Sequence, residues 1–297
     1  MNKPSDPKIL TGAGQLGPYP METLKRVDEP TTSIVGPIER FDEREHGFNR
    51  AARGDYGSRA QYRSSRGYPV SGAVASNYVG LAAMDLGEST ATKERARAVL
   101  EAATPPYPLP DDLGILTRHV KSMGYFMGAD VVGVCRIPRY AVYSHDSAGS
   151  PVENDHPNAV AIVVDQDYRT MDASTGDDWI SAAQSHRAYT TSAFIAFAVA
   201  AYIRKLGYAA RVHYSEDYQL VLPPLLLLAG VGEIARNGIV LNPFLGLRFK
   251  AAVVSTDMPL EADQPVDFGL QDFCKKCKKC AVECLSLIHI SEPTRLC

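Results

Sequence analysis

Four cysteines near residue 280 carry the strongest chemical signal in this 297-residue sequence. Cys274, Cys277, Cys280 and Cys284 are separated by two, two and three residues, which is the spacing of half of a bacterial ferredoxin motif. Three thiolates on a tight loop can each bind one iron of a [4Fe–4S] cluster, and soft sulfur ligands suit iron. The fourth cysteine of such a run usually binds a second cluster. The spacing therefore predicts an iron–sulfur site.

A zinc site would be the alternative use of these cysteines. Zinc sites usually pair two Cys-x2-Cys knuckles that a longer loop separates, whereas these cysteines follow one another at short intervals. The lysines between them, at positions 275, 276, 278 and 279, add positive charge that favours the reduced state of a cluster. Leu285 stands where a proline normally follows the fourth cysteine, and Cys297 is the only cysteine after it in the sequence. We therefore expect an incomplete ligand set.

The overall composition is that of a globular protein without an extended basic surface. Hydrophobic residues make up 45% of the chain, and 31 lysines and arginines balance 34 acidic residues, which argues against a nucleic-acid partner. The most apolar run, residues 220–231, is too short to span a bilayer, and the N-terminus has neither a signal peptide nor twin arginines. We therefore expect a cytoplasmic protein without a membrane partner. Clustered cysteines in such a protein indicate metal binding rather than disulfides.

The elements that must position these cysteines alternate between helices and strands. Helical patterns occupy four segments, residues 92–103, 111–123, 179–206 and 224–238. Nearly continuous apolar runs predict strands covered on both faces at residues 129–136, 159–165 and 249–256. This alternation predicts an α/β fold. Residues 1–75, rich in Pro, Gly, Arg, Tyr and Ser, predict an irregular arm, so we expect ordered structure to begin near residue 76.

The helix predicted for residues 179–206, with Asp177 or Asp178 as its cap and Gly207 as its stop, has two distinct faces. An apolar stripe that should pack on the sheet consists of Ile195, Val199, Tyr202 and Leu206. Another face surrounds the phenol of Tyr189 with small residues, namely Ser185, Ser192, Ala193, Ala196 and Ala200. Small residues let either another backbone or a flat ligand approach the helix, and packing is the more frequent case.

From Tyr189 onward the sequence resembles the reductive dehalogenase family over roughly a third of the chain. The motifs that carry the resemblance occur in the family's order and with its spacing. They are Tyr189, residues 202–208 (YIRKLGY), 224–233 (PLLLLAGVGE) and 236–238 (RNG), Asn242, Pro243, Arg248, and residues 256–260 (TDMPL), 263–269 (DQPVDFG) and 273–280 (FCKKCKKC). Each motif alone is weak, and together they are specific.

The resemblance implies a fold, cofactors and partners. Members of this family bind a corrinoid in an α/β domain similar to nitroreductases, followed by a ferredoxin-like module with two [4Fe–4S] clusters, and they remove halide from organohalides. The resemblance implies that the substrate is a small aromatic organohalide. The implied electron donor is a ferredoxin or a fused flavin reductase module, as in the cytoplasmic, catabolic branch of the family.

The resemblance also implies site residues. Tyr189 matches the family's proton-donating tyrosine and Arg248 its partner arginine, which would stabilise the phenolate left after proton transfer. From the residues alone, Tyr189 could be an ordinary packed tyrosine, and Arg248 could pair with a carboxylate. Residues implied to line the corrinoid are Tyr214, Ser215, Tyr218, Asn237, Gly238 and Asn242.

Two further positions concern the cofactor pocket. Some members of the family use a lysine or an asparagine in the pocket, and the spacing places that position near Ser215 or Glu216, where neither residue type occurs. His213 would suit an axial cobalt ligand by residue type, but the family typically has no protein histidine in that role.

These assignments divide the chain into four parts. We expect an irregular arm at residues 1–75, a corrinoid-binding domain at 76–265, an incomplete ferredoxin-like segment at 266–284, and a tail at 285–297. The tail resembles translated sequencing-adapter read-through, so we expect it to be non-native, the natural protein to be longer and the chain as given to be inactive.

Two other functions remain open at this point. A relative of epoxyqueuosine reductase would use the same cofactors on a tRNA base, and for it a more basic surface would be expected. A non-catalytic iron–sulfur electron carrier would use the cysteines, but it would leave the large α/β region without a role.

Overall fold

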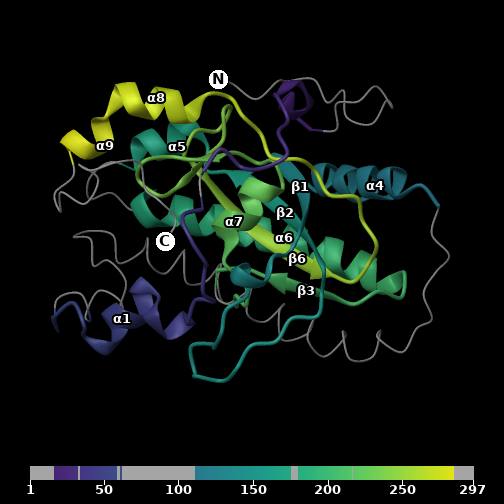
Figure 1. Cartoon of the computed structure of the whole chain (residues 1–297), viewed down its shortest axis with the longest axis horizontal. Helices are drawn as coiled ribbons and strands as arrows, with labels where there is room; N and C mark the ends of the chain where they lie inside the picture. Colours follow the sequence, from purple (N-terminus) through teal and green to yellow (C-terminus); the bar gives the residue numbers. More distant parts are fainter. Residues whose placement is uncertain are drawn as a thin grey trace.

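The computed structural model describes residues 17–32, 34–58, 61, 111–174, 180–215 and 217–283 (Figure 1). Several sequence predictions lie outside the described residues. They are the helix at residues 92–103, the helix cap at Asp177 or Asp178, Glu216, Cys284 and the tail at 285–297.

An antiparallel sheet of four strands lies at the centre of the described structure, in the order β1-β2-β6-β3 (Figure 1). The strands are β1 (Val131–Arg136), β2 (Asn158–Asp165), β3 (Ala210–His213) and β6 (Phe249–Thr256). Val160 of β2 pairs with Val134 of β1 on one side and with Val254 of β6 on the other. The mixed α/β character expected from the sequence is confirmed, although all neighbouring strands run antiparallel.

Both faces of the sheet are buried because side chains alternate between the faces along each strand. Ile162 and Val254 belong to the core formed with α4 (Leu113–Phe126) and α6 (Ile180–Lys205). Val163 and Val253, one residue along, belong to the core formed with α7 (Leu222–Leu228). This double coverage explains why the strands are apolar almost continuously.

The helices α4 and α6 lie close to their predicted positions. The carboxylate of Asp112 caps α4, accepting hydrogen bonds from the amides of Gly114 at 2.8 Å and Ile115 at 3.3 Å. Gly207 follows α6 with φ of 87°, a left-handed conformation that glycine adopts without steric cost. Ile195 from the predicted apolar stripe is fully buried against the sheet.

The prediction of one helix over residues 224–238 is wrong in its second half. Helix α7 ends at Leu228, and the chain then forms the two-stranded hairpin β4 (Glu233–Ile234) and β5 (Val240–Leu241). Gly230 turns the chain with φ of 65°. A Cβ atom at Gly232 would lie 2.1 Å from the carbonyl oxygen of Leu241, so the hairpin requires glycine there. These two glycines end the apolar helix early.

The N-terminal residues that the structure describes pack onto the α/β domain. Tyr19 and Met21 are buried in the core on the α7 side of the sheet, and Arg26 forms an isolated β-bridge with Val266. Order therefore begins well before residue 76, since these side chains complete a core that would otherwise be open.

The remaining helical segments are short. They are η1 (Met21–Thr23), η2 (Glu43–Glu45), α1 (Gly47–Arg53), η3 (Arg139–Ala141), α5 (Tyr168–Ala173), α8 (Leu270–Cys277) and α9 (Lys279–Val282). In the described part of the chain, no helix combines the length and apolar character that crossing a membrane requires.

Candidate active site

Tyr189 on α6 meets a lysine that the sequence analysis did not single out. The Nζ atom of Lys250 lies 4.8 Å from the centroid of the Tyr189 ring, within cation–π range. Lys250 is the second residue of β6, and its side chain follows the row of Ala252 and Val254, which pack in the α6-side core. The alternation of β6 therefore directs Lys250 toward α6.

Burial makes Lys250 an unusual cation. Removal from water lowers the pKa of its ammonium group. No carboxylate pairs with Lys250 among the residues that the structure describes. A half-buried cation without an ion pair marks a candidate functional position, because structural lysines are rarely buried unpaired.

His186 lies one helical turn before Tyr189 and adds a third titratable group. Burial lowers the pKa of its imidazole, and the charge of Lys250 lowers it further. Its buried Nδ1 atom has no hydrogen-bond partner among the described residues. We refer to Tyr189, Lys250 and His186 as the tyrosine–lysine site. Sequence reasoning missed Lys250 and His186, although the period-two pattern of β6 could have identified the former.

Arg248, the partner expected for Tyr189, forms an ion pair with a carboxylate. Its Nε atom lies 3.1 Å from Oδ1 of Asp165, at the end of β2. Burial raises the pKa of Asp165, and the charge of Arg248 opposes that shift. The carbonyl of Arg248 also accepts a hydrogen bond from the amide of Gln166 at 2.9 Å. These contacts bind the start of β6 to the end of β2, beside the tyrosine–lysine site.

A side-chain network fixes the first turns of α6 to the same sheet edge. The Nε2 atom of Gln166 donates to Oγ of Ser185 at 2.9 Å and to Oε1 of Gln184. The guanidinium of Arg187 donates to the carbonyl of Gln166 at 3.1 Å. Helix α6, which carries Tyr189, is thus bound to Gln166 through residues 184, 185 and 187. Ser185 is also one of the small residues on the face of Tyr189.

The residues expected to line the corrinoid fall into two groups. Asn242 and Tyr214 are buried within the protein. Asn242 donates to the carbonyl of Val231 at 2.7 Å and accepts from the amides of the turn that follows it. Tyr214 packs edge-on against Phe197 with ring centroids 5.4 Å apart. Internal contacts therefore account for both side chains.

The other expected lining residues are partly exposed. Ser215 and Tyr218 lie on the loop after β3, and Tyr218 packs against the α7-side core. Asn237 accepts a hydrogen bond from the amide of Ile239 in the β4–β5 turn, where Gly238 has φ of 78°. A Cβ atom at Gly238 would meet nothing within 4 Å, so its backbone faces open space.

His213 is fully buried and is engaged through both ring nitrogens. Its Nδ1 atom accepts from the amide of Gln219 at 3.2 Å, which leaves the proton on Nε2, 2.9 Å from Oγ of Ser255. The same hydroxyl lies 2.9 Å from Nδ1 of His156. Burial lowers the pKa of His213 well below its usual value. The imidazole is therefore neutral, structural and unavailable as a cobalt ligand.

Cys274, Cys277 and Cys280 lie on two short helices, α8 and α9, within residues 270–283, which we call the cysteine segment (Figure 1). Cys274 is buried on α8 beside Leu270, and Cys277 ends α8 and is exposed. Lys278 adopts a left-handed conformation with φ of 52°, which turns the chain into α9 and Cys280.

The donor set of the cysteine segment fits an iron–sulfur cluster by chemistry and by spacing. However, the described residues contain no group of three His, Cys, Asp or Glu side chains placed to hold a metal ion. For a corrinoid, the fitting observation is the tyrosine–lysine site. Among the described residues, the Nδ1 atom of His186 has no hydrogen-bond partner and the half-buried Lys250 has no carboxylate partner, and a bound polar molecule would satisfy both groups.

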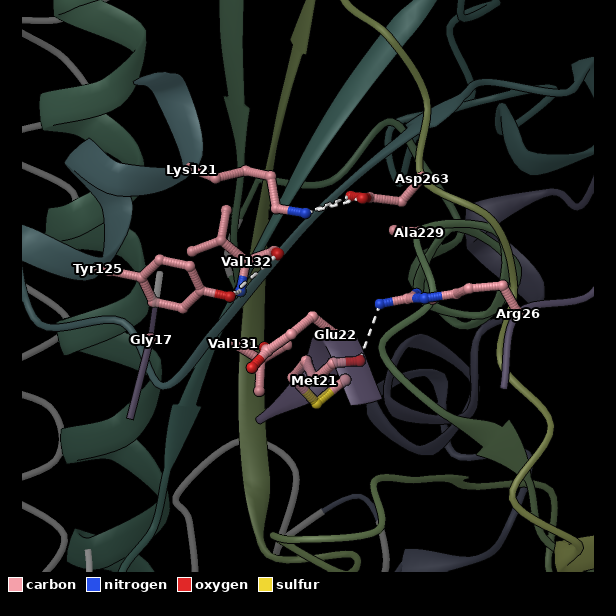
Figure 2. A pocket seen from close by; sticks show the side chains of 11 residues that line it. Gly17, Met21, Glu22, Arg26, Lys121, Tyr125, Val131, Val132, Ala229 and Asp263 are labelled. Carbon is pink, nitrogen blue, oxygen red and sulfur yellow. Dashed lines mark hydrogen bonds and ion pairs between the residues drawn. The ribbon is translucent and has the colours of Figure 1, made fainter. Parts of the chain in front are cut away.

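A separate cavity of about 60 Å³ lies between the N-terminal arm, α4, β1 and the turn after α7 (Figure 2). Lys121 Nζ and Asp263 Oδ1 pair at 2.7 Å on one side of it, and Arg26 donates to the carbonyl of Met21 on the other (Figure 2). A cavity of this size holds only a few water molecules. It contains none of the expected site residues, so the candidate active site is the tyrosine–lysine site.

Comparisons with known proteins show what this chain is similar to. No family model matches the sequence. The chain is 36% identical over 138 residues to the tetrachloroethene reductive dehalogenase of Dehalobacter restrictus, covering 46% of this chain and 24% of that protein. It is 29% identical over 201 residues to the corresponding enzyme of Sulfurospirillum multivorans, covering 58% of this chain and 40% of that protein.

Solved structures extend the similarity to almost the whole chain. The catabolic reductive dehalogenase NpRdhA is 39% identical and superposes with a TM-score of 0.77, covering 91% of this chain and 38% of that chain. A further reductive dehalogenase structure matches at 40% identity with the same TM-score and coverage. The chain thus spans less than half the length of these relatives. By sequence and by fold, it is a homologue of the reductive dehalogenases, a family of oxidoreductases.

Proposed function

We propose that the intact protein removes halide from an aromatic organohalide by reduction, and that the tyrosine–lysine site delivers the proton. The homologues named above are reductive dehalogenases, which supports the reaction class. One structure of NpRdhA is described in complex with 3-bromo-4-hydroxybenzoic acid, a halogenated phenol, which supports an aromatic substrate.

The reaction consumes two electrons and one proton for each carbon–halogen bond. The bond breaks, halide leaves, and carbon gains the proton. A corrinoid, when bound, would supply the electrons that break the bond. The hydroxyl of Tyr189 donates the proton to the carbon, and the phenolate that remains recovers a proton from water.

The contact between Tyr189 and Lys250 is the observation that carries this proposal. An ammonium group 4.8 Å from the ring stabilises negative charge on the phenolate more strongly in a partly dry site than in water. We assign Arg248 an indirect part, because its ion pair with Asp165 holds the start of β6 and so places Lys250. His186 completes the polar surroundings with its unpaired nitrogen.

The other expected residues keep supporting parts in the proposal. Ser215, Tyr218, Asn237 and Gly238 remain candidates for contacts with the corrinoid, since they are partly exposed. Asn242 and Tyr214 would support those loops from within. The cysteine segment would contribute ligands for [4Fe–4S] clusters, which a ferredoxin or a flavin reductase module would reduce.

Halide release from halophenols tests the proposal directly. The protein is produced with cobalamin, its clusters are reconstituted, and turnover is followed under a strong reductant. Tyr189→Phe should lower turnover at least 100-fold, within the range of about 10²–10⁴ expected for a general acid, while corrinoid content stays constant. Tyr202→Phe, on the same helix, is the matched control and should retain turnover. Unchanged turnover in Tyr189→Phe would rule out the tyrosine as the proton donor.

A further inference from the structure

Glu233 is a buried carboxylate that joins three parts of the chain. It lies in β4 and is only 2% exposed. A buried carboxylate is costly unless it is well hydrogen-bonded. Its two oxygens accept three hydrogen bonds, none of them from β5, the strand that pairs with β4.

Two of these hydrogen bonds come from the first residue of α8 and from the residue just before its N-cap. The Oε2 atom of Glu233 accepts from the amides of Phe268 at 2.8 Å and Leu270 at 3.2 Å. The N-cap residue of α8 is Gly269, which has no side chain to satisfy these donors. Glu233 therefore caps α8 from another element, and its charge lies at the positive end of the helix dipole.

The third hydrogen bond comes from the N-terminal arm. The hydroxyl of Thr31 donates to Oε1 of Glu233 at 2.6 Å. Nearby, Lys25 pairs with Asp267 at 2.6 Å, and the bridge between Arg26 and Val266 joins the arm to the strand-like residues before α8. The arm, the β4–β5 hairpin and the start of α8 thus meet at one carboxylate.

The rest of α8 is attached to the domain by few contacts. The side chain of Gln271 donates to the carbonyl of Ile234 at 2.9 Å, and Leu270 and Cys274 bury themselves against Ala235. All of these contacts join the first two turns of α8 to the β4–β5 hairpin, which also carries Glu233. The orientation of Cys274 and Cys277 therefore depends on how the first turn of α8 is held.

We propose that Glu233 is the positioning residue that fixes α8, and with it Cys274 and Cys277, on the α/β domain. Its relevance to electron transfer rests on the proposed iron–sulfur role of the cysteine segment. The hydrogen bonds themselves do not depend on a bound cluster, so the positioning role is measurable without one.

Hydrogen–deuterium exchange on the full chain tests this role. Glu233→Ala removes the acceptor of two amides in residues 268–274, so amide exchange there should accelerate at least tenfold, because a single lost hydrogen bond corresponds to a factor of about ten. Exchange in β6 should not change. In Glu233→Gln, the side-chain carbonyl oxygen can accept from the two amides while the side-chain NH2 group donates to the Thr31 hydroxyl oxygen, so protection should be retained. Unchanged exchange in Glu233→Ala, or equal acceleration in β6, would overturn the proposal.

Thr31→Val separates the arm from the helix. It removes the arm's hydrogen bond and leaves the amides of Phe268 and Leu270 with their acceptor, so acceleration should be confined to residues 25–32. Acceleration in residues 268–274 equal to that of Glu233→Ala would overturn the proposal, because the arm would then be what positions α8. Glu29→Gln, an exposed glutamate of the same arm, is the matched control and should change neither region.

Iron and sulfide content after reconstitution gives the second readout. Content per chain should fall in Glu233→Ala and recover in Glu233→Gln, whereas full content in Glu233→Ala would overturn the proposal. If no protein binds iron, wild type included, while exchange responds as expected, the positioning role stands and the iron–sulfur part of the proposed function fails.

Discussion

In the tyrosine–lysine site, the reactive side chains lie on a helix of 26 residues and a strand of eight that share one large core. The cysteine segment consists of helices of eight and four residues, and the core cluster that joins α8 to the domain is small, with Ala235, Leu270 and Cys274 as its buried members. In the first region, the proposed chemistry depends on burial, which places beside the Tyr189 ring an ammonium group that has no carboxylate partner among the described residues. In the second region, the proposed cluster binding follows from the spacing of the cysteines. The carboxylate of Glu233, outside the segment, fixes the helix α8 that carries Cys274 and Cys277.

The two regions should therefore respond very differently to loss of a buried side chain. Ile203→Ala on α6 removes a fully buried residue of the large core and should lower the free energy of unfolding by about 3–4 kcal/mol. Leu270→Ala in the cysteine segment should cost less than half as much, because its core is small and can relax. Urea denaturation measures both. Equal losses would show that the cysteine segment is as stable as the large core between the sheet and α6.

Acid should lower the free energy of unfolding through the buried side chain of His213. Its pKa lies well below the usual value when folded, so below pH 6.5 the unfolded chain binds a proton that the folded chain does not. Stability should then fall by up to about 1.4 kcal/mol for each pH unit that this proton is withheld. Denaturation at pH 7.5, 6.5 and 5.5 should show a smaller slope in His213→Asn. An identical slope in the variant would contradict the assignment of a buried neutral imidazole.

The smallest effect is expected in the exposed charges of the cysteine segment. Lys275 pairs with Asp272 at 3.1 Å, but both side chains are more than half exposed. Lys275→Ala should change the free energy of unfolding by no more than about 0.5 kcal/mol, as is usual for exposed pairs. A larger loss, measured by the same denaturation, would show that this segment depends on its surface charges as well as on Glu233.

Local patterns in the sequence predicted the long helices and three of the four strands of the sheet, β1, β2 and β6, but not the short edge strand β3. The apolar run at residues 249–256 coincides with β6, and the pattern ending at Gly207 matches α6. The prediction of a helix up to Gly238 was wrong because the run of leucines favours a helix but says nothing about the two glycines after it. Gly230 and Gly232 lie where another part of the backbone approaches closely, and the helix ends before them.

The candidate site was less accessible to sequence reasoning. Tyr189 was identified by resemblance, but Lys250 lies 61 positions away and meets it only because β6 packs under α6. The spacing of the family motifs directed attention to Ser215 and Glu216 instead. Glu233 was named only as the end of a motif, since its three partners come from segments that are distant in the sequence. Tertiary contacts of this kind leave no local pattern.

Replacement of Lys250 tests the central claim, that this lysine is the cation serving Tyr189. Halide release from halophenols is compared among the wild type, Lys250→Met and the matched control Lys205→Met, an exposed lysine at the end of α6, with corrinoid content measured in each. Loss of one preorganised charge at the reacting group should lower turnover of Lys250→Met about 100-fold, with corrinoid retained and the control unaffected. Wild-type turnover in Lys250→Met would show that Lys250 is not the cation that serves Tyr189.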